Sequence, residues 1–267
     1  VGDDLNDTVV ERLGRAIGTY YRRHGICEMT LGRDCRLSSK GLRDALANGL
    51  MQTGMTITDI GVCHTPLLYF SLFHKDLNAG VMITGSHNPP EFNGFKVCFG
   101  KTTIYGSEIQ ELKKIALRNN FISGTGSISE AHIMTEYIQK IASDIGVLSK
   151  KKVVVDAGNG TGGQAAIPLL NKIGCDVIPI FCDMDGRFPH HHPDPTVPEY
   201  MKTLIDTVLH EKADLGIGYD GDADRIGVVD EKGNIIWGDQ LMIVFSRDIL
   251  QRHPGATFIS EVKGSQN

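Results

Sequence analysis

A repeated order of segments limits the fold of this chain more than any other feature of its 267 residues. A β-rich run, a polar loop and a helix that ends in glycine occupy residues 28–54, and the same order returns in residues 151–174. Each helix leads into another β-rich run, at residues 55–61 and 175–181. The order predicts α/β units in which helices cover mixed sheets. Spacing alone leaves open whether the units are true repeats, because any two strand-helix-strand units look alike.

The domain boundaries follow from this order and from local composition. Residues 118–132 are rich in glycine, serine and charged side chains, which is typical of a linker. We therefore expect a first domain over residues 1–131, opened by an amphipathic helix, and a second domain over residues 132–234. The β-rich order begins a third time at residues 256–267. Residues 235–267 are accordingly expected to be the truncated start of a third domain.

The composition argues against several classes of protein. A net charge of -5 provides no basic field for nucleic acid, so no nucleic-acid partner is expected. The chain has no apolar run of membrane-spanning length, and its first residues lack the pattern of a signal peptide, so we expect no membrane partner and a cytoplasmic location. The six cysteines are scattered without a C-x-x-C pair, which favours buried or half-buried free thiols over zinc, redox or disulfide sites.

Three closely spaced carboxylates predict a metal site. Asp220, Asp222 and Asp224 alternate with small residues in "LGIGYDGDADRIGVVDEKG", and so close a group needs a cation to offset its repulsion. Oxygen ligands without His or Cys favour Mg²⁺ or Ca²⁺. The spacing also matches an EF-hand, with Glu231 at its twelfth position, but Arg225 stands where that loop needs glycine and the flanks resemble strands. We predict Mg²⁺ in a loop between strands, with a solvated acidic turn as the alternative and Arg225 as a phosphate ligand.

The segment "TGSHNPPEFNGFK", residues 84–96, follows the apolar run "AGVMI" and places Ser86 on a stiff polar loop. A hydrolase nucleophile elbow is disfavoured because Thr84 and Asn88 stand where its pattern needs glycine. His87 is adjacent in sequence, so its side chain is expected to diverge from that of Ser86. Lys96 begins the next apolar run. The segment therefore predicts an exposed hydroxyl with a cation nearby, suited to a phosphate that also has a metal.

A glycine-rich loop supports a competing hypothesis. "VVVDAGNGTGG" spaces Gly158, Gly160 and Gly163 as G-x-G-x-x-G between a strand and a helix, and Asp183 follows at the distance expected of a ribose-binding acid. A nucleotide-dependent oxidoreductase is the alternative function on this ground. Asp156 opposes it, because a carboxylate would stand where a pyrophosphate approaches the helix. A tight connection between strand and helix is the favoured interpretation.

Two further loops carry polar clusters. His190 to His192 lie between prolines in "FPHHHPDP", and consecutive histidines cannot all face one ion, so we predict a structural or interdomain loop. "GRDCRLSS" places Arg33 and Arg36 between a strand and a helix. They bind an anion there, or they form a surface ion-pair face with Ser38 or Ser39 as the helix N-cap; the sequence leaves both open.

The motifs "TGSHNPPEFNGFK" and "DGDADRIGVV" resemble those of the α-D-phosphohexomutase family, in its bacterial phosphomannomutase/phosphoglucomutase branch. "GRDCRLSSKGL", "TPLLYF", "VVVDAGNGTGG" and "FPHHHPDP" extend the resemblance along the chain. It implies repeated phosphohexomutase-type α/β/α domains with mixed sheets. It also implies reversible transfer of phosphate between the 6- and 1-hydroxyls of a hexose, through a phosphoserine and a hexose 1,6-bisphosphate.

The resemblance assigns roles to individual residues. Ser86 corresponds to the phosphoserine, and Asp220, Asp222 and Asp224 correspond to the Mg²⁺ ligands, with a phosphoserine oxygen as a further ligand. His87, Lys96 and Arg225 correspond to catalytic groups around the phosphoryl transfer. Such chemistry depends on positioning and on neutralising charge, which matches what the residues themselves indicate.

The match to the family is partial. Its members have four domains, and this chain matches the first two and the start of the third, without the sugar-recognition loop "GEMSGH". We expect a chain that binds Mg²⁺ and carries phosphate on Ser86 but has little or no mutase turnover, as a monomer or weak dimer. Mannose and glucose phosphates remain alternative partners. A non-catalytic Mg²⁺-binding fragment is a further hypothesis.

Overall fold

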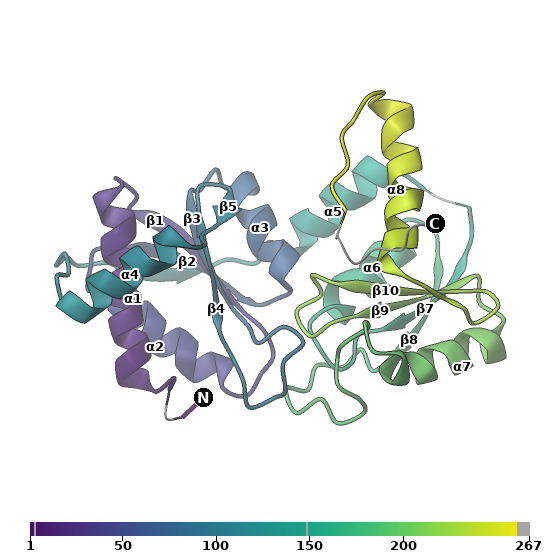
Figure 1. Ribbon diagram of the computed structural model, residues 1–267, viewed down its shortest axis with the longest axis horizontal. Coiled ribbons are helices and arrows are strands. Elements are labelled where there is room, and N and C mark those ends of the chain that lie inside the picture. The colour runs from purple at the N-terminus through teal and green to yellow at the C-terminus, as the bar shows by residue number, and fades with distance from the viewer. Residues whose placement is uncertain (3, 148, 261–267) are drawn as a thin grey trace.

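The computed structural model describes residues 1–2, 4–147 and 149–260, and it contains two α/β bodies side by side (Figure 1). Each body is built on one mixed sheet. The first sheet has six strands in the order β5-β4-β3-β1-β2-β6. Its members are β1 Glu28–Arg33, β2 Thr56–Val62, β3 Ala79–Ile83, β4 Phe95–Phe99, β5 Thr102–Thr103 and β6 Ser127–Glu130. The pairs β3–β4 and β4–β5 are antiparallel, and the other pairs of this sheet are parallel.

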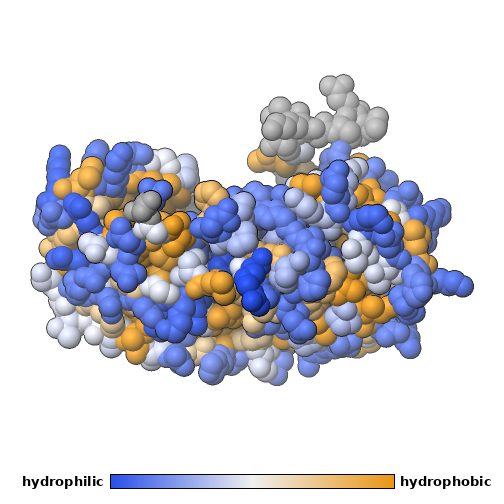
Figure 2. Space-filling view, turned by 90° about the horizontal axis from the view of Figure 1, so that it is seen from below, coloured by the Kyte–Doolittle hydropathy of each residue, from blue (hydrophilic) through white to orange (hydrophobic). Residues whose placement is uncertain are grey.

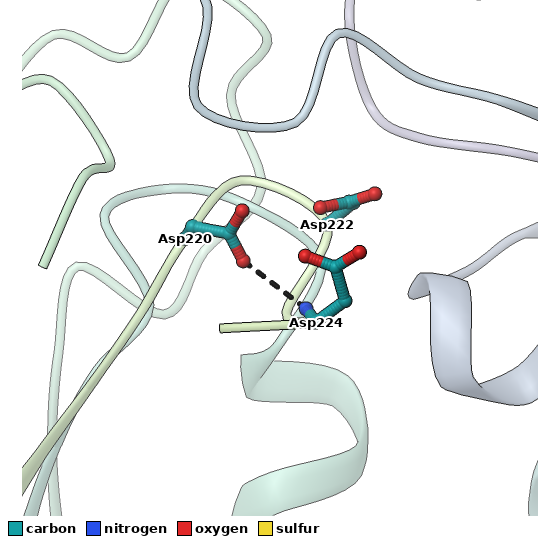
Figure 3. A group of neighbouring side chains, drawn as sticks. All are labelled: Asp220, Asp222 and Asp224. Atoms are coloured by element: carbon teal, nitrogen blue, oxygen red, sulfur yellow. Dashed lines mark hydrogen bonds between the residues drawn. The ribbon is translucent and has the colours of Figure 1, made fainter. Parts of the chain in front are cut away.

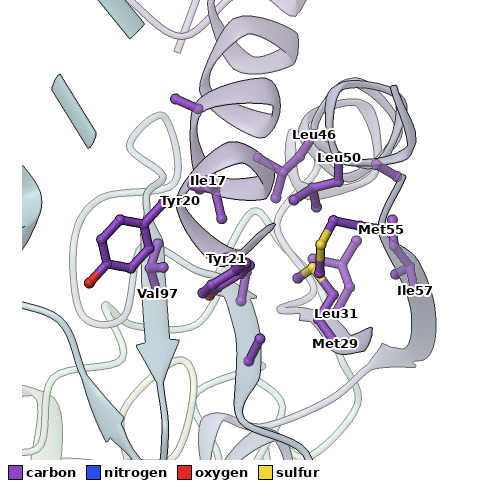
Figure 4. Close-up of a cluster of buried hydrophobic side chains, with 14 of the residues drawn as sticks. Ile17, Tyr20, Tyr21, Met29, Leu31, Leu46, Leu50, Met55, Ile57 and Val97 are labelled. Carbon is purple, nitrogen blue, oxygen red and sulfur yellow. The ribbon is translucent and has the colours of Figure 1, made fainter. Parts of the chain in front are cut away.

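Helices cover both faces of the first sheet, because its central strands are apolar on both sides. In β3, Val81 and Ile83 belong to the core under α1 Asp7–Arg23 and α2 Ser39–Met51, whereas Met82 belongs to the core under α3 Thr65–His74. Figure 4 shows the larger core, where α1 and α2 side chains meet those of β1 and β2. The fourth helix of this body is α4 Ser107–Arg118, which packs on α1.

The second sheet has five strands in the order β11-β10-β9-β7-β8. They are β7 Lys152–Asp156, β8 Asp176–Ile180, β9 Leu215–Tyr219, β10 Ile226–Asp230 and β11 Ile235–Ile236. β7, β8 and β9 are parallel to one another, β10 is antiparallel to β9, and β11 is antiparallel to β10. The helices are α5 Met134–Ile145, α6 Gly163–Lys172, the 3₁₀ helix η1 Pro198–Met201 and α7 Lys202–Glu211. The predicted α/β class with mixed sheets is therefore confirmed.

The segments between and after the sheets differ from the prediction. Strand β6 lies inside residues 118–132, which we predicted as a linker, and pairs with β2 at the edge of the first sheet. Strand β11 pairs with β10, so the second sheet continues past residue 234. It is followed by α8 Gly238–Arg252, drawn in yellow in Figure 1. Residues 256–260 form no strand where a third β-rich run was predicted, and the rest of that run lies outside the described residues.

One face of the surface is drawn in Figure 2. That side mixes hydrophilic and apolar residues across both bodies, as is usual for an exposed surface. Among the described residues, no helix combines the length and the apolar character needed to span a membrane. All six cysteines are free, and all but the exposed Cys27 are buried or half-buried, as predicted.

Candidate functional site

The site forms where the carboxyl ends of parallel strands from the two sheets face each other. In the first sheet, the loops after β1, β2 and β3 leave the same edge, because these strands are parallel neighbours. In the second sheet, the loops after β7, β8 and β9 leave one edge for the same reason. The serine, acid, glycine-rich and histidine motifs lie on these loops, and Lys96 lies on β4.

The serine loop, residues 84–94, connects β3 to β4 and holds Ser86 in an uncommon conformation. Ser86 has φ +49°, in the left-handed region that residues other than glycine rarely adopt. Its backbone N–H donates to Thr84 Oγ1 at 2.8 Å, and the Thr84 N–H donates to the Gly94 carbonyl at 3.0 Å. Such local strain persists only where surrounding contacts hold it. The loop therefore presents the Ser86 hydroxyl in one defined direction.

The acid loop, residues 220–225, is the turn between the antiparallel strands β9 and β10 (Figure 3). Asp220, Asp222 and Asp224 each place a carboxylate oxygen within 4.8 Å of the others. Asp220 Oδ1 accepts the backbone N–H groups of Asp224 and Arg225, both at 3.1 Å, which closes the turn. Asp220 and Asp222 are fully buried, whereas Asp224 is exposed. Strands flank the loop as predicted, which rules out the helix-flanked EF-hand.

The serine loop and the acid loop are in direct contact. Ser86 Oγ donates to Asp220 Oδ2 at 2.7 Å. Lys96, in β4, donates from Nζ to Asp222 Oδ2 at 2.6 Å and to Asp224 Oδ2 at 2.5 Å. The structure thus brings the predicted serine, the predicted lysine and the three predicted carboxylates to one place.

A second contact with the acid loop comes from the start of α3. The Thr65 N–H donates to the Asp222 carbonyl at 2.9 Å, and Thr65 Oγ1 donates to Asp222 Oδ2 at 2.5 Å. Asp222 therefore lies at the N-terminus of α3, a helix of the first body, where a negative charge is stabilised. The sequence analysis did not assign Thr65 to the site, although this residue opens the segment "TPLLYF" that carries part of the family resemblance.

Burial and the charges of the site together shift the pKa values of Asp220, Asp222 and Lys96. Burial, followed by the nearby Asp222 and Asp224 carboxylates, raises the pKa of Asp220 to about 7. Burial acts in the same direction on Asp222, but the charge and hydrogen bond of Lys96 outweigh it and lower the pKa of Asp222. Burial opposes the charge on Lys96, yet its two carboxylate partners raise the Lys96 pKa. Lys96 alone thus leaves part of the negative charge of the acid loop without compensation.

The donor set fits a magnesium ion. Asp222 Oδ1 is buried without a hydrogen-bond partner among the described residues, which is costly unless a cation or a water satisfies it. The oxygens available to an ion are those of Ser86, Asp220, Asp222 and Asp224, and a purely oxygen set suits Mg²⁺. Lys96 Nζ already lies between two of these carboxylates, which shows that the group accommodates positive charge.

His87 and Arg225 flank the contact between the two loops. His87 Nδ1 lies 3.4 Å from Ser86 Oγ, so the expectation that their side chains diverge is wrong. The left-handed backbone at Ser86 breaks the regular alternation on which that expectation depended. Arg225 is exposed, and its guanidinium has no hydrogen bond or ion pair among the described residues, although its charge helps to lower the pKa of Asp194. Its five donors are therefore available to an anion.

The glycine-rich loop after β7 packs against other segments of the protein, which argues against the nucleotide hypothesis. At each of the three glycines a Cβ would lie 2.6–2.8 Å from another segment. The atoms it would meet are Pro193 Cβ at Gly158, the Gly221 carbonyl at Gly160 and the Cys182 carbonyl at Gly163. Close approach of the backbone is what these glycines provide. Asp156 accepts the Gly158 N–H at 2.8 Å and lies 3.0 Å from His191 Nε2, so its carboxylate is already paired within the protein. The favoured tight connection is thus confirmed.

The histidine loop and the arginine loop both serve the interface. His192 Nε2 donates to the His87 carbonyl of the serine loop, whereas His190 and His191 bond to Asn159 and Asp156 of their own body, so the predicted structural or interdomain loop is confirmed. Arg36 is buried and bonded to the serine loop, so neither the anion site nor the surface ion-pair face describes it. The Ser38 side chain makes no capping bond at the start of α2, and the Ser39 hydroxyl donates to Asp34 instead.

Comparison with known proteins identifies the family. The profile for domain I of the phosphoglucomutase/phosphomannomutase family, an alpha/beta/alpha domain, matches residues 1–123, and the profile for domain II matches residues 135–233. This chain belongs to the phosphoglucomutase/phosphomannomutase family. The family resemblance and the phosphohexomutase-type fold expected from the sequence are therefore confirmed.

Individual members of the family support the assignment. The phosphomannomutase/phosphoglucomutase of Pseudomonas aeruginosa is 43% identical over 263 residues, which are 98% of this chain and 57% of that protein. A phosphoglucomutase of Neisseria meningitidis is 41% identical over 268 residues, all of this chain and 58% of that protein. The crystal structure of a family protein from Burkholderia thailandensis superposes with a TM-score of 0.96 at 38% identity, over all of this chain and 60% of that one. The chain thus spans somewhat more than half the length of these relatives.

Proposed function

We propose that this chain carries the phosphoserine and magnesium part of a phosphohexomutase active site. In the complete reaction, phosphate moves reversibly between the 6- and 1-hydroxyls of a hexose, mannose or glucose, by way of a phosphoserine and a hexose 1,6-bisphosphate. The observation that carries the proposal is the 2.7 Å hydrogen bond from Ser86 Oγ to Asp220, within a group of three carboxylates that fits Mg²⁺. The named mutases among the relatives support it.

Each residue has a role that follows from its position. Ser86 Oγ accepts the phosphoryl group, so that an Oγ–P bond forms while the bond from phosphorus to the sugar oxygen breaks. When bound, Mg²⁺ on Asp220, Asp222 and Asp224 supplies positive charge near the transferred oxygens. Lys96 adds fixed positive charge beside the acid loop, and Arg225 on the exposed side has donors free for a phosphate. His87 lies 3.4 Å from Ser86 Oγ, near enough to exchange a proton with the hydroxyl.

The domain assignment forms part of the proposal. Residues 1–131 would supply the serine and residues 132–234 would supply the metal ligands. Residues 235–267, whose first strand β11 completes the second sheet, would lead into a third domain. Recognition of the sugar belongs to parts of the family proteins that this chain does not match, since it covers 57–60% of their lengths. We therefore expect phosphate transfer to Ser86 but little or no turnover of mannose 6-phosphate to mannose 1-phosphate.

The test is transfer of phosphate to Ser86. The chain is incubated with glucose 1,6-bisphosphate and MgCl₂, and the peptide that contains Ser86 is analysed by mass spectrometry. We expect one added phosphate on Ser86 with Mg²⁺ present, none after chelation, and none in Ser86→Ala. An unmodified Ser86 in the presence of Mg²⁺ would instead favour the non-catalytic Mg²⁺-binding hypothesis. Robust conversion of mannose 6-phosphate by the chain would contradict the expected lack of turnover.

A further inference from the structure

Arg36 lies in the loop between β1 and α2, and its guanidinium has no contact with solvent. The side chain is 0% exposed, as is rare for an arginine, and its ion-pair partner Asp34 is 2% exposed. Arg36 makes no contact with the carboxylates of the acid loop. The acceptors of its five N–H donors therefore account for its burial next to the site.

All five donors of Arg36 are used, and four of them hold the serine loop. Nε donates to Asp34 Oδ2 at 3.0 Å, which fixes the plane of the guanidinium. Nη2 donates to the carbonyls of Ser86 at 2.8 Å and Asn88 at 2.7 Å, and Nη1 donates to those of Pro89 at 2.6 Å and Phe92 at 3.1 Å. Four carbonyls of one loop thus converge on a single rigid group. The arrangement is one that the planar fork of arginine can satisfy and the point charge of lysine cannot.

The same guanidinium joins the serine loop to the second sheet. A Cβ at Gly85 would lie 2.6 Å from Arg36 Cζ, so the loop backbone rests directly on the guanidinium. On the other side, Cζ lies 5.0 Å from the centre of the Phe188 ring, which comes from the loop after β8. A Cβ at Gly186 would lie 2.7 Å from Arg36 Cα. Arg36 is therefore packed between the loop that carries Ser86 and the body that carries the carboxylates.

We propose that Arg36 is a positioning residue for phosphoryl transfer, which sets the place of Ser86 Oγ relative to the acid loop without touching substrate. The inference rests on the proposed function of Ser86. The Ser86 carbonyl is one of the four acceptors, and Ser86 adopts the strained φ of +49°, so the loop needs outside support to keep its hydroxyl at Asp220. A misplacement of about 1 Å in a reacting group costs on the order of 10²-fold in rate.

The experiment compares Arg36→Lys with Arg43→Lys. Arg43 is a matched control because it is an arginine of the neighbouring helix α2, paired with Asp59 and Asp44, and it has no bond to the serine loop. Three quantities are measured on the chain: the rate of Ser86 phosphorylation at saturating glucose 1,6-bisphosphate, the affinity for Mg²⁺, and amide hydrogen exchange in residues 84–94. A merely structural role would change all regions of the first body alike.

We expect Arg36→Lys to slow phosphorylation on the order of 10²-fold at saturating donor, with Mg²⁺ affinity unchanged. The amides of residues 84–94 should exchange about tenfold faster or more, while those of β1 and α2 keep their protection. Arg43→Lys should match the wild type in all three measurements.

Two results would overturn the inference: an Arg36→Lys rate equal to that of the wild type, or loop exchange that is unchanged by the substitution. If the wild type itself is never phosphorylated, the proposed function fails, and the exchange data still decide separately whether Arg36 holds the loop. Faster exchange confined to residues 84–94 would then support the positioning role, and unchanged exchange would refute it.

Discussion

Replacing Gly221 with alanine should separate the two loops of the site. Gly221 lies between two metal-site aspartates, and a Cβ there would stand 2.5 Å from the Ser86 carbonyl oxygen. Ordinary carbon-to-oxygen contacts lie at about 3.3–3.6 Å, so the serine loop has to retreat by about 0.8–1.1 Å. The hydrogen bond from Ser86 Oγ to Asp220, now 2.7 Å, would then be stretched beyond a useful length. We expect a loss on the order of 10²-fold in the rate of Ser86 phosphorylation.

The assay measures both the rate and the stability of Gly221→Ala. Gly221 does not adopt a left-handed φ, so alanine adds a steric clash and no backbone strain. The clash should cost about 1–3 kcal/mol in the free energy of unfolding. Gly41→Ala is the matched control: it makes the same chemical change in α2, where a Cβ meets nothing within 4 Å, and it should stabilise the chain by roughly 0.5–1 kcal/mol. A Gly221→Ala protein that is phosphorylated within about threefold of the control rate would refute the contact as a determinant of transfer.

Two further predictions concern charge. Lys96→Met removes the cation between Asp222 and Asp224. Without Mg²⁺ the substitution should lower the free energy of unfolding by about 2 kcal/mol, and Mg²⁺ should raise its Tm more than it raises the Tm of the wild type. Equal rises in Tm would contradict this prediction. Burial lowers the pKa of His191, but its hydrogen bonds and ion pair with Asp156 outweigh burial and raise it above 6.5. The resulting stabilisation, about 1 kcal/mol, is full below about pH 6.5 and is lost as the pH rises through the folded-state pKa. In urea unfolding, the gap between wild type and His191→Gln should therefore shrink with rising pH, and a gap that widens would refute the assignment.

The elements were predictable because each has a local cause. The apolar runs of β3 and β7 predict buried strands, and the polar residues that follow them predict loops. Strand β6 could not be predicted, since Ser127–Glu130 is short and polar and forms a strand only because β2 leaves an edge free beside it. The same holds for β11, whose two residues depend on β10 for their pairing.

The site was predictable where the chemistry of a side chain is specific, and it was not where the role is structural. Three aspartates in five positions predict a cation, whatever surrounds them. Arg36 carries no such signature, because its partners are backbone carbonyls of a loop about 50 residues away, and any residue type provides a carbonyl. Thr65 was missed for a related reason, since its partner Asp222 belongs to the other sheet.

The charges of the site also bear on how the two bodies hold together. The acid loop belongs to the second sheet, and the groups that offset or satisfy it, Lys96 and the N-terminal end of α3 at Thr65, belong to the first. Asp220 and Asp222 are fully buried in the docked molecule, where a charge left without these partners would cost several kcal/mol. Docking of the two bodies and assembly of the site are therefore one event, in which the carboxylates that suit a metal also fix the serine loop above them.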